Sequence, residues 1–478
     1  MMQDYEMVIG LEVHVELKTE TKIFCGCSTA FGAAPNTQCC PVCMGLPGTL
    51  PVLNKKVVEY AVRAGLATHC TIARYSKQDR KNYFYPDLPK AYQISQYDLP
   101  LCEHGYLEIQ TSEGEKRIGI TRIHIEEDAG KLVHKEGGGT LCDYNRCGVP
   151  LIEIVSEPDI RSAEEAKQYV RKLRAIMMYT GVSDCKMQEG SLRCDVNLSV
   201  RKKGETAFGT RTEMKNLNSF QFIGKAIEYE FTRQVKALEA GEEIVQETRR
   251  FDQQSGKTFS MRRKENADDY RYFPDPDLIP VITEQAWLDE MQQSIPQLPD
   301  DRKKNYMEQY GLSAADADLL TADLLIADYF EAAACACDNP KTLAHLMLGE
   351  MLKLLPADAE TIPIRAAHMA ELCQLLTEDK INNGTAKKLV KQMWQEDRAP
   401  SVLAEEQQLW QINDASILQD TVQRVMKQDT KSVADFHAGK TNALKALIGR
   451  AMQETGGQAN PKLLAELMEN ALKESEVK

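Results

Sequence analysis

The sequence predicts an α+β protein in which an N-terminal domain with an antiparallel sheet is followed by all-helical regions. Before about residue 290, segments that alternate apolar and polar residues are interleaved with helix-like segments. Beyond that point the hydrophobic pattern is almost purely helical. The length of 478 residues suggests about three domains at roughly 150 residues each. We place them at 1–292, 293–405 and 406–478.

The N-terminal region contains four segments with the period-two pattern of half-buried strands. They cover residues 5–17, 118–128, 149–155 and 192–200. Amphipathic helices are expected over 55–68, 162–179 and 219–240. The second of these begins at Ser162, and Glu165 three residues later completes a capping box. Hairpin-like strands mixed with helices are typical of a domain with an antiparallel sheet.

The composition, with 43% hydrophobic and 27% charged residues, is that of a soluble globular chain. A net charge of −13 argues against general affinity for nucleic acids, although a local basic face would suffice for binding. Residues 23–54 carry no charge, but four prolines and four glycines exclude a membrane span there. The first residues lack a signal-peptide pattern. We therefore expect a cytoplasmic protein without membrane association.

Five of the 14 cysteines fall between Cys25 and Cys43. Cys25 and Cys27 form one close pair, and Cys40 and Cys43 form another, with twelve residues between the pairs. Four thiolates suit a tetrahedral Zn²⁺ ion, and a site closed by four cysteines is structural. Cys39 is an alternative ligand. Buried free cysteines are the competing interpretation, but two pairs at this spacing favour metal in a reducing compartment.

Several predicted strands carry acidic and histidine side chains at alternate positions, so that these side chains share one face of the sheet. A face with oxygen ligands suits Mg²⁺, which usually binds together with substrate phosphates. The competing interpretation is an ordinary solvated face. That interpretation is weakest for Glu153, because a buried carboxylate needs a partner. The side chains are Glu12, His14 and Glu16 in the first strand, His124, Glu126 and Asp128 in the second, Glu153 in the third, and Asp195 and Asn197 in the fourth.

A third pattern combines basic and aromatic residues. It occurs at 80–87, RKNYFYPD, which is followed by Lys90, and again at 269–274, DYRYFP. Basic groups among aromatic rings suit phosphate contacts and stacking on bases or riboses. A packed loop whose lysine stems cover apolar surface would give the same pattern. The sequence contains neither a P-loop nor a Rossmann glycine motif, so nucleotide chemistry would depend on the acidic sheet face.

The N-terminal 280 residues resemble, almost continuously, the B subunit of the aspartyl/glutamyl-tRNA amidotransferase family. The last stretch of the chain, from GKTNALKALIGRAMQETGG onward, is similar to the tail domain of the same family. The strings that carry the resemblance include IGLEVHVELKT, RKNYFYPDLPKAYQISQYDLPL, HIEEDAGK, DYNRCGVPLIEIVSEPDIRS, QEGSLRCDVNLSVR, TEMKNLNSF and DYRYFPDPDL.

The resemblance implies an ATP-dependent ligase in translation that works as a heterotrimer. An amidase partner would hydrolyse glutamine and send ammonia through a channel, and a small third partner would brace the other two. The chain itself would phosphorylate the side-chain carboxylate of Glu on tRNA(Gln) or of Asp on tRNA(Asn), and ammonia would displace the phosphate. The implied catalytic domain has the glutamine synthetase/guanidino kinase fold, an antiparallel sheet that holds Mg²⁺ and ATP. The helical and tail domains would support the tRNA.

The resemblance also implies site residues. Strand alternation favours Glu126 as a Mg²⁺ ligand, with Glu127 as the alternative if the strand bulges. Lys81 and Lys90 would line the ammonia path beside the kinase site. The implied Mg²⁺ ligands are Glu12, His14, Glu126 or Glu127, and Glu153, and the implied Zn²⁺ ligands are Cys25, Cys27, Cys40 and Cys43. The implied nucleotide or phosphate contacts are Arg193, Asp195, Asn197, Lys215 and Asn216.

Two other functions compete with this one. A zinc-stabilised tRNA-binding protein without catalysis would not need Glu12, His14 and Glu153 on a shared face. A free-standing ATP-dependent amide ligase for a small molecule would have no use for the helical and tail domains. The sequence leaves both Glu-tRNA and Asp-tRNA open as substrates.

Overall fold

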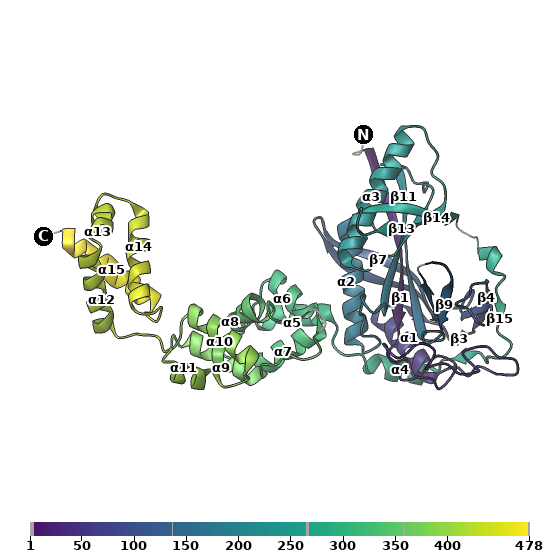
Figure 1. Ribbon diagram of the computed structural model, residues 1–478, viewed down its shortest axis with the longest axis horizontal. Coiled ribbons are helices and arrows are strands. Elements are labelled where there is room, and N and C mark those ends of the chain that lie inside the picture. Colours follow the sequence, from purple (N-terminus) through teal and green to yellow (C-terminus); the bar gives the residue numbers. More distant parts are fainter. Residues whose placement is uncertain (1–3, 136, 264–266, 357–358, 477–478) are drawn as a thin grey trace. The chain divides into compact units, whose positions relative to one another are not determined.

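The computed structural model describes residues 4–135, 137–263, 267–356 and 359–476. The chain divides into two compact units, 1–301 and 302–478. The first contains a large sheet with helices and the second is helical, so the predicted α+β class is confirmed (Figure 1). The second unit contains two hydrophobic cores, one between Tyr306 and Ala404 and one between Leu418 and Leu472. The division into three domains stays a prediction.

The main sheet of the first unit has nine strands in the order β14-β13-β12-β11-β1-β10-β7-β6-β2. All neighbours are antiparallel except β12 and β13. The expectation of an antiparallel sheet is wrong at this one pair, because helix α3 (Phe220–Glu239) provides the crossover that a parallel connection needs. The strands are β1 (Tyr5–Glu16), β2 (Thr71–Ile72), β6 (Cys102–Thr111), β7 (Gly114–Glu127), β10 (Pro150–Ser156), β11 (Leu192–Lys202), β12 (Thr212–Lys215), β13 (Glu247–Asp252) and β14 (Lys257–Arg263).

The four strands predicted from alternation are β1, β7, β10 and β11, and they are neighbours in the centre of the sheet. The three predicted helices are α1 (Lys55–Ala67), α2 (Ala163–Tyr179) and α3 (Phe220–Glu239). The Ser162 side chain accepts a hydrogen bond from the Glu165 backbone and so caps α2 as expected. These predictions are confirmed to within a few residues at each end.

The apolar face of the central strands packs against these helices. Leu11, Val13 and Val15 of β1 are fully or almost fully buried in one hydrophobic core together with residues of α1, α2 and α3. Because side chains alternate along a strand, this burial leaves Glu12 and His14 on the opposite face. The sheet face that the helices do not cover therefore carries the polar side chains.

Within the part of the first unit that the structure describes, three smaller sheets and a long irregular segment accompany the main sheet. Residues 23–54 contain turns and bends rather than helices or strands, as their prolines and glycines predict. Helix α4 spans Gln285–Gln293. One small sheet has three strands in the order β15 (Phe273–Pro274), β4 (Asp79–Asn82) and β5 (Tyr92–Ser95). A second pairs β16 (Val281–Ile282) with β3 (Tyr75–Ser76), and a third pairs β8 (Lys131–His134) with β9 (Thr140–Asp143).

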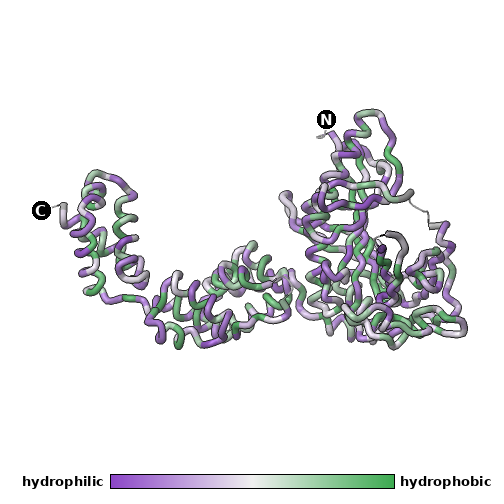
Figure 2. The backbone as a smooth tube through the Cα atoms, viewed as in Figure 1, coloured by the Kyte–Doolittle hydropathy of each residue, from purple (hydrophilic) through white to green (hydrophobic). Residues whose placement is uncertain are grey.

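The second unit consists of short helices in which hydrophilic and hydrophobic residues are mixed along each helix (Figure 2). Among the described helices, none combines the length and the apolar character that crossing a membrane requires. The helices are α5 (Pro299–Gln309), which begins in the first unit, α6 (Ala314–Thr321), α7 (Leu324–Ala334), α8 (Pro340–Leu346), α9 (Ala366–Thr377), α10 (Asn383–Gln395), α11 (Pro400–Glu406), α12 (Ala415–Gln428), α13 (Thr430–His437), α14 (Thr441–Glu454) and α15 (Pro461–Glu476).

Candidate active site

The polar face of the main sheet lines a cavity of about 810 Å³. Its walls come from the central strands and from residues 81–97 and 270–272. Most of the residues that the sequence predicts for catalysis and nucleotide binding line this cavity. They are Glu12, His14, Lys81, Glu126, Glu153, Arg193, Asp195, Lys215 and Asn216.

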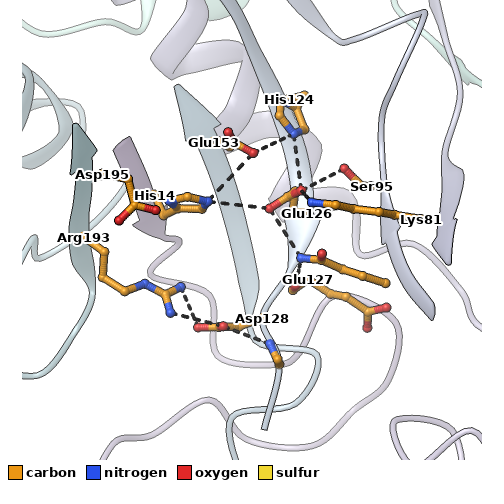
Figure 3. Close-up of polar contacts among 12 residues, drawn as sticks. His14, Lys81, Ser95, His124, Glu126, Glu127, Asp128, Glu153, Arg193 and Asp195 are labelled. Carbon is orange, nitrogen blue, oxygen red and sulfur yellow. Dashed lines mark hydrogen bonds and ion pairs between the residues drawn. The ribbon is translucent and has the colours of Figure 1, made fainter. Parts of the chain in front are cut away.

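The first acidic group in the cavity consists of His14, Glu126 and Glu153, which come from three neighbouring strands (Figure 3). His14 of β1 is the cross-strand partner of Glu153 of β10, which in turn faces His124 of β7. His14 Nε2 lies 3.8 Å from Glu153 Oε2 and 4.0 Å from Glu126 Oε2. One ligand atom each from His14, Glu126 and Glu153 lies within 4.8 Å of the other two. The arrangement could hold a cation.

The carboxylates of this group are held in the ionised state. Burial alone would raise the pKa of Glu126, but the charge of Lys81, whose Nζ lies 3.8 Å from Glu126 Oε1, and the hydrogen bond from His124 lower it to about 2. Burial likewise opposes ionisation of Glu153, but His124, 3.2 Å away, lowers its pKa well below the usual range. Anionic oxygens are the form that binds a hard cation.

A second acidic group lies beside the first and consists of Glu12, Asp195 and Glu213. Glu12 and Asp195 are cross-strand partners in β1 and β11, and one oxygen of each of the three carboxylates lies within 4.8 Å of the others. The Asn197 amide donates a hydrogen bond to Glu12 Oε1 at 2.8 Å. Lys215 Nζ lies 2.6 Å from Asp195 Oδ2 and 3.5 Å from Glu213 Oε1. This lysine offsets part of the negative charge.

Glu213 is absent from the residues that the sequence predicts. It lies on β12, whose four residues are too few to show a convincing period of two. The available signal was the apolar Met214 between Glu213 and Lys215, because Met214 is buried in the core while its two neighbours face the cavity.

Arg193 and Asn216 already have protein partners. The Arg193 guanidinium donates to Asp128 Oδ2 at 2.8 Å. Glu16 of β1 interacts with the same two residues, and burial together with the charge of Asp128 raises the pKa of Glu16 to about 8. The Asn216 side chain donates to the backbone carbonyl of Phe251 at 3.1 Å. Their nucleotide contacts stay a prediction.

Glu127 and Lys90 lie apart from the first cavity. Strand β7 continues without a bulge through Glu126 and Glu127, so the two side chains point to opposite faces. Glu127 Oε1 accepts a hydrogen bond from the Ile94 backbone at 2.8 Å and forms an ion pair with Lys90. This pair lines a second cavity of about 210 Å³, next to Cys25 and Cys43.

The four predicted zinc ligands meet in space. The sulfurs of Cys25, Cys27, Cys40 and Cys43 lie within 4.8 Å of one another, and a set of four sulfurs fits a tetrahedral Zn²⁺ ion. The Cys39 thiol instead donates to the Asn36 carbonyl at 3.3 Å. The hydrogen bond between Cys25 and Cys43 lowers the pKa of Cys43 to about 5 and raises the pKa of Cys25 above the usual thiol range, so it favours the thiolate on Cys43 alone.

The first unit is thus an α+β domain whose open sheet face carries two adjacent acidic groups in a cavity, and it belongs to the class of proteins in which such a domain is followed by a helical unit. Comparison with known proteins specifies the family. Residues 7–289 match the GatB/GatE catalytic domain, and residues 328–472 match the GatB domain.

Full-length relatives give the same assignment. The chain is 55% identical over 476 residues to the aspartyl/glutamyl-tRNA(Asn/Gln) amidotransferase B subunit of Caldicellulosiruptor saccharolyticus, covering 98% of this chain and 99% of the relative. It is 54% identical over 478 residues to that of Carboxydothermus hydrogenoformans, with 98% and 99% coverage. It is 51% identical over 477 residues to that of Geobacter sulfurreducens, with 98% and 100% coverage. The chain belongs to the family of aspartyl/glutamyl-tRNA amidotransferase B subunits, which confirms the resemblance seen in the sequence.

Proposed function

We propose that this chain uses ATP to phosphorylate the side-chain carboxylate of Glu on tRNA(Gln) or of Asp on tRNA(Asn), and then amidates it with ammonia. The observation that supports this most strongly is the pair of acidic groups in one cavity with Lys81 and Lys215 beside them. A protein that only binds tRNA would have no need to keep five ionised or ionisable carboxylates on one sheet face.

The donor sets fit Mg²⁺. His14, Glu126 and Glu153 would hold one ion, and Glu12, Asp195 and Glu213 would hold a second. Because Glu12 and His14 are two residues apart on β1, their backbone positions are roughly 6–7 Å apart. One polyphosphate chain can span such a distance. Bound Mg²⁺ would neutralise phosphate oxygens during transfer.

Positively charged side chains of this chain would act on the transferred phosphoryl group. Burial lowers the pKa of Lys81, but the charge of Glu126 outweighs this and raises it, so Lys81 stays charged and cannot serve as a base. Its ammonium can stabilise the phosphoryl oxygens as one carboxylate oxygen attacks the γ-phosphorus and ADP leaves. Ammonia then attacks the acyl carbon, and phosphate leaves. The glutamine synthetase/guanidino kinase fold suits such a site and is part of the proposal.

We assign part of the ammonia route to the second cavity, which is separate from the cavity that holds the acidic groups. Lys90 and Glu127 give it a polar lining beside the cysteine cluster. Ammonia that travels inside the protein reaches the acyl phosphate while water stays excluded, which protects the intermediate from hydrolysis. Because the relatives are B subunits, we assign this chain to a heterotrimer with an amidase partner and a small third partner. Structural Zn²⁺ on the four cysteines would fix residues 23–54.

A reconstituted assay tests the proposal. The chain with its amidase partner is supplied with [γ-³²P]ATP, glutamine, and either Glu-tRNA(Gln) or Asp-tRNA(Asn) in separate tubes. We expect phosphate release that matches the amount of amidated aminoacyl-tRNA, and the productive tube identifies the substrate. Tight tRNA binding without coupled phosphate release would instead support a zinc-stabilised protein that only binds tRNA.

A further inference from the structure

Five tyrosines form a continuous row of neighbouring rings, and four of them lie along one wall of the first cavity. In order, the rings of Tyr85, Tyr83, Tyr270, Tyr272 and Tyr97 are neighbours, with centroid distances of 6.0, 5.9, 6.2 and 4.3 Å. Both basic–aromatic segments of the sequence contribute to this aromatic row. The catalytic roles proposed above leave these tyrosines unused.

The aromatic row leads from the cavity to the surface. Tyr83, Tyr270, Tyr272 and Tyr97 line the cavity. Both ends of the row are exposed, Tyr85 by 44% and Tyr97 by 42%, and Phe84 next to Tyr85 is 72% exposed. Exposed rings that continue the wall of a cavity are typical of an interaction site. The guanidinium of Arg271 lies 5.9 Å from the Phe84 ring, and Lys81 Nζ lies 5.1 Å from the Tyr270 ring.

The backbone that presents the aromatic row is held in an unusual conformation. Arg271 has a φ of +44°, which costs energy for a residue with a side chain. The Asn82 amide donates to the carbonyls of Tyr270 and Arg271, at 3.3 and 2.7 Å. Pairing of Phe273 with Arg80 across β15 and β4 fixes the next residues. Such strain persists where the surroundings enforce it, and it is typical of binding sites.

The chemistry of the substrate identifies what this wall would bind, if the proposed function holds. The amino acid is esterified to the terminal ribose of tRNA. When the side-chain carboxylate of this amino acid lies at the acidic groups, the unpaired 3′ nucleotides are only a few bonds away and lie at the cavity wall. Aromatic rings interleaved with Lys and Arg are the usual surface for unpaired RNA. We propose that the aromatic row, together with Phe84 and Arg271, binds the unpaired 3′-terminal nucleotides of the tRNA substrate.

Equilibrium binding to two RNAs tests this proposal. The assembled complex is titrated with uncharged tRNA(Gln) transcript, either full length or lacking its unpaired 3′ nucleotides. For wild type, we expect truncation to weaken binding. Phe84→Ala and Tyr85→Ala should each weaken binding of the full-length RNA by about tenfold and leave binding of the truncated RNA unchanged. Tyr85→Phe should bind as wild type, because the ring is kept.

A matched control is Phe208→Ala. Phe208 is 64% exposed and has the Arg201 guanidinium 5.8 Å from its ring, but it lies outside the aromatic row. The Phe208→Ala substitution should leave the affinities for the full-length and the truncated RNA unchanged. Three results would overturn the proposal. Wild type could bind the two RNAs equally, the variants could lose the same affinity for both RNAs, or the Phe84 or Tyr85 variants could lose their partner proteins. Binding is measured without ATP or glutamine, so a failure of the activation chemistry would not affect this result.

Discussion

His14 and Glu153 face each other across two neighbouring strands, with His14 Nε2 3.8 Å from Glu153 Oε2. Antiparallel pairing of β1 and β10 brings together two residues that are far apart in the chain. The carboxylate is ionised because His124 lies on its other side. The proposed metal and phosphate chemistry depends on this pairing.

Glu153→Gln should remove most of the transfer activity. The substitution keeps the shape of the side chain but removes one anionic ligand and the partner of two histidines. We expect formation of amidated tRNA to fall by about 100-fold or more, while the glutaminase activity of the amidase partner persists. Glu157→Gln is the control, because Glu157 is exposed and outside the cavity. Unchanged product formation in Glu153→Gln would contradict the site assignment.

Glu213→Gln tests the second acidic group separately. Loss of one carboxylate among Glu12, Asp195 and Glu213 should weaken Mg²⁺-dependent ATP binding by about tenfold or more. Titration with ATP at several Mg²⁺ concentrations measures the change. Glu205→Gln is a control at an exposed position on the preceding turn. If both variants bind ATP as wild type does, Glu213 has no role in holding the nucleotide.

Cys40 and Cys39 are adjacent but should differ in their effect on metal content. The sulfur of Cys40 belongs to the four-sulfur group, whereas the Cys39 thiol bonds to a backbone carbonyl. Elemental analysis should find one Zn²⁺ per chain in wild type and in Cys39→Ser, and much less in Cys40→Ser. Because structural zinc contributes to folding, Cys40→Ser should also lower the Tm of the first unit by ~5 °C or more. Full zinc retention in Cys40→Ser would exclude it as a ligand.

Glu230 gives a prediction for the dependence of stability on pH. This fully buried carboxylate accepts hydrogen bonds from Thr212, Thr258, Arg233 and Gln234. Burial raises its pKa, but Arg233 and the other donors outweigh this and lower it below 4.5. A lowered pKa means that the stabilisation is present above the unfolded-state value and is lost as the pH falls through the folded-state value.

Glu230→Gln should therefore cost about 2 kcal/mol of unfolding free energy at pH 7. The difference from wild type should shrink as the pH falls from the unfolded-state pKa of a glutamate, about 4.3, towards the lower folded-state pKa, because the unfolded chain then binds the proton before the folded one does. Urea denaturation of both chains at several pH values measures this. A difference that is constant down to pH 3 would show that the charge of Glu230 does not contribute.

Local pattern was enough to predict the central strands and the face on which their polar side chains lie. Alternation in β1, β7, β10 and β11 placed Glu12, His14 and Glu153 on one face, and it favoured Glu126 over Glu127, which points away from this face. Period-two alternation is a property of the single strand, so no knowledge of the fold was required.

Features that depend on pairing between distant segments were not predictable. The parallel β12–β13 pair depends on where α3 returns the chain. Glu213 lies near Glu12 only because β12 and β1 are both paired with β11. Lys81 and Lys90 are close in sequence, yet they pair with Glu126 and Glu127 on opposite faces of β7. The helix and strand patterns hold no information on such tertiary partners.

The most direct test of the central claim is isotope transfer from the carboxylate to phosphate. The complex is given ATP, glutamine, and aminoacyl-tRNA whose side-chain carboxylate carries ¹⁸O. If this chain phosphorylates the carboxylate, the bridging oxygen leaves with phosphorus, and the released inorganic phosphate should contain one ¹⁸O for each amide formed. Amidated tRNA formed with unlabelled phosphate would contradict activation through an acyl phosphate.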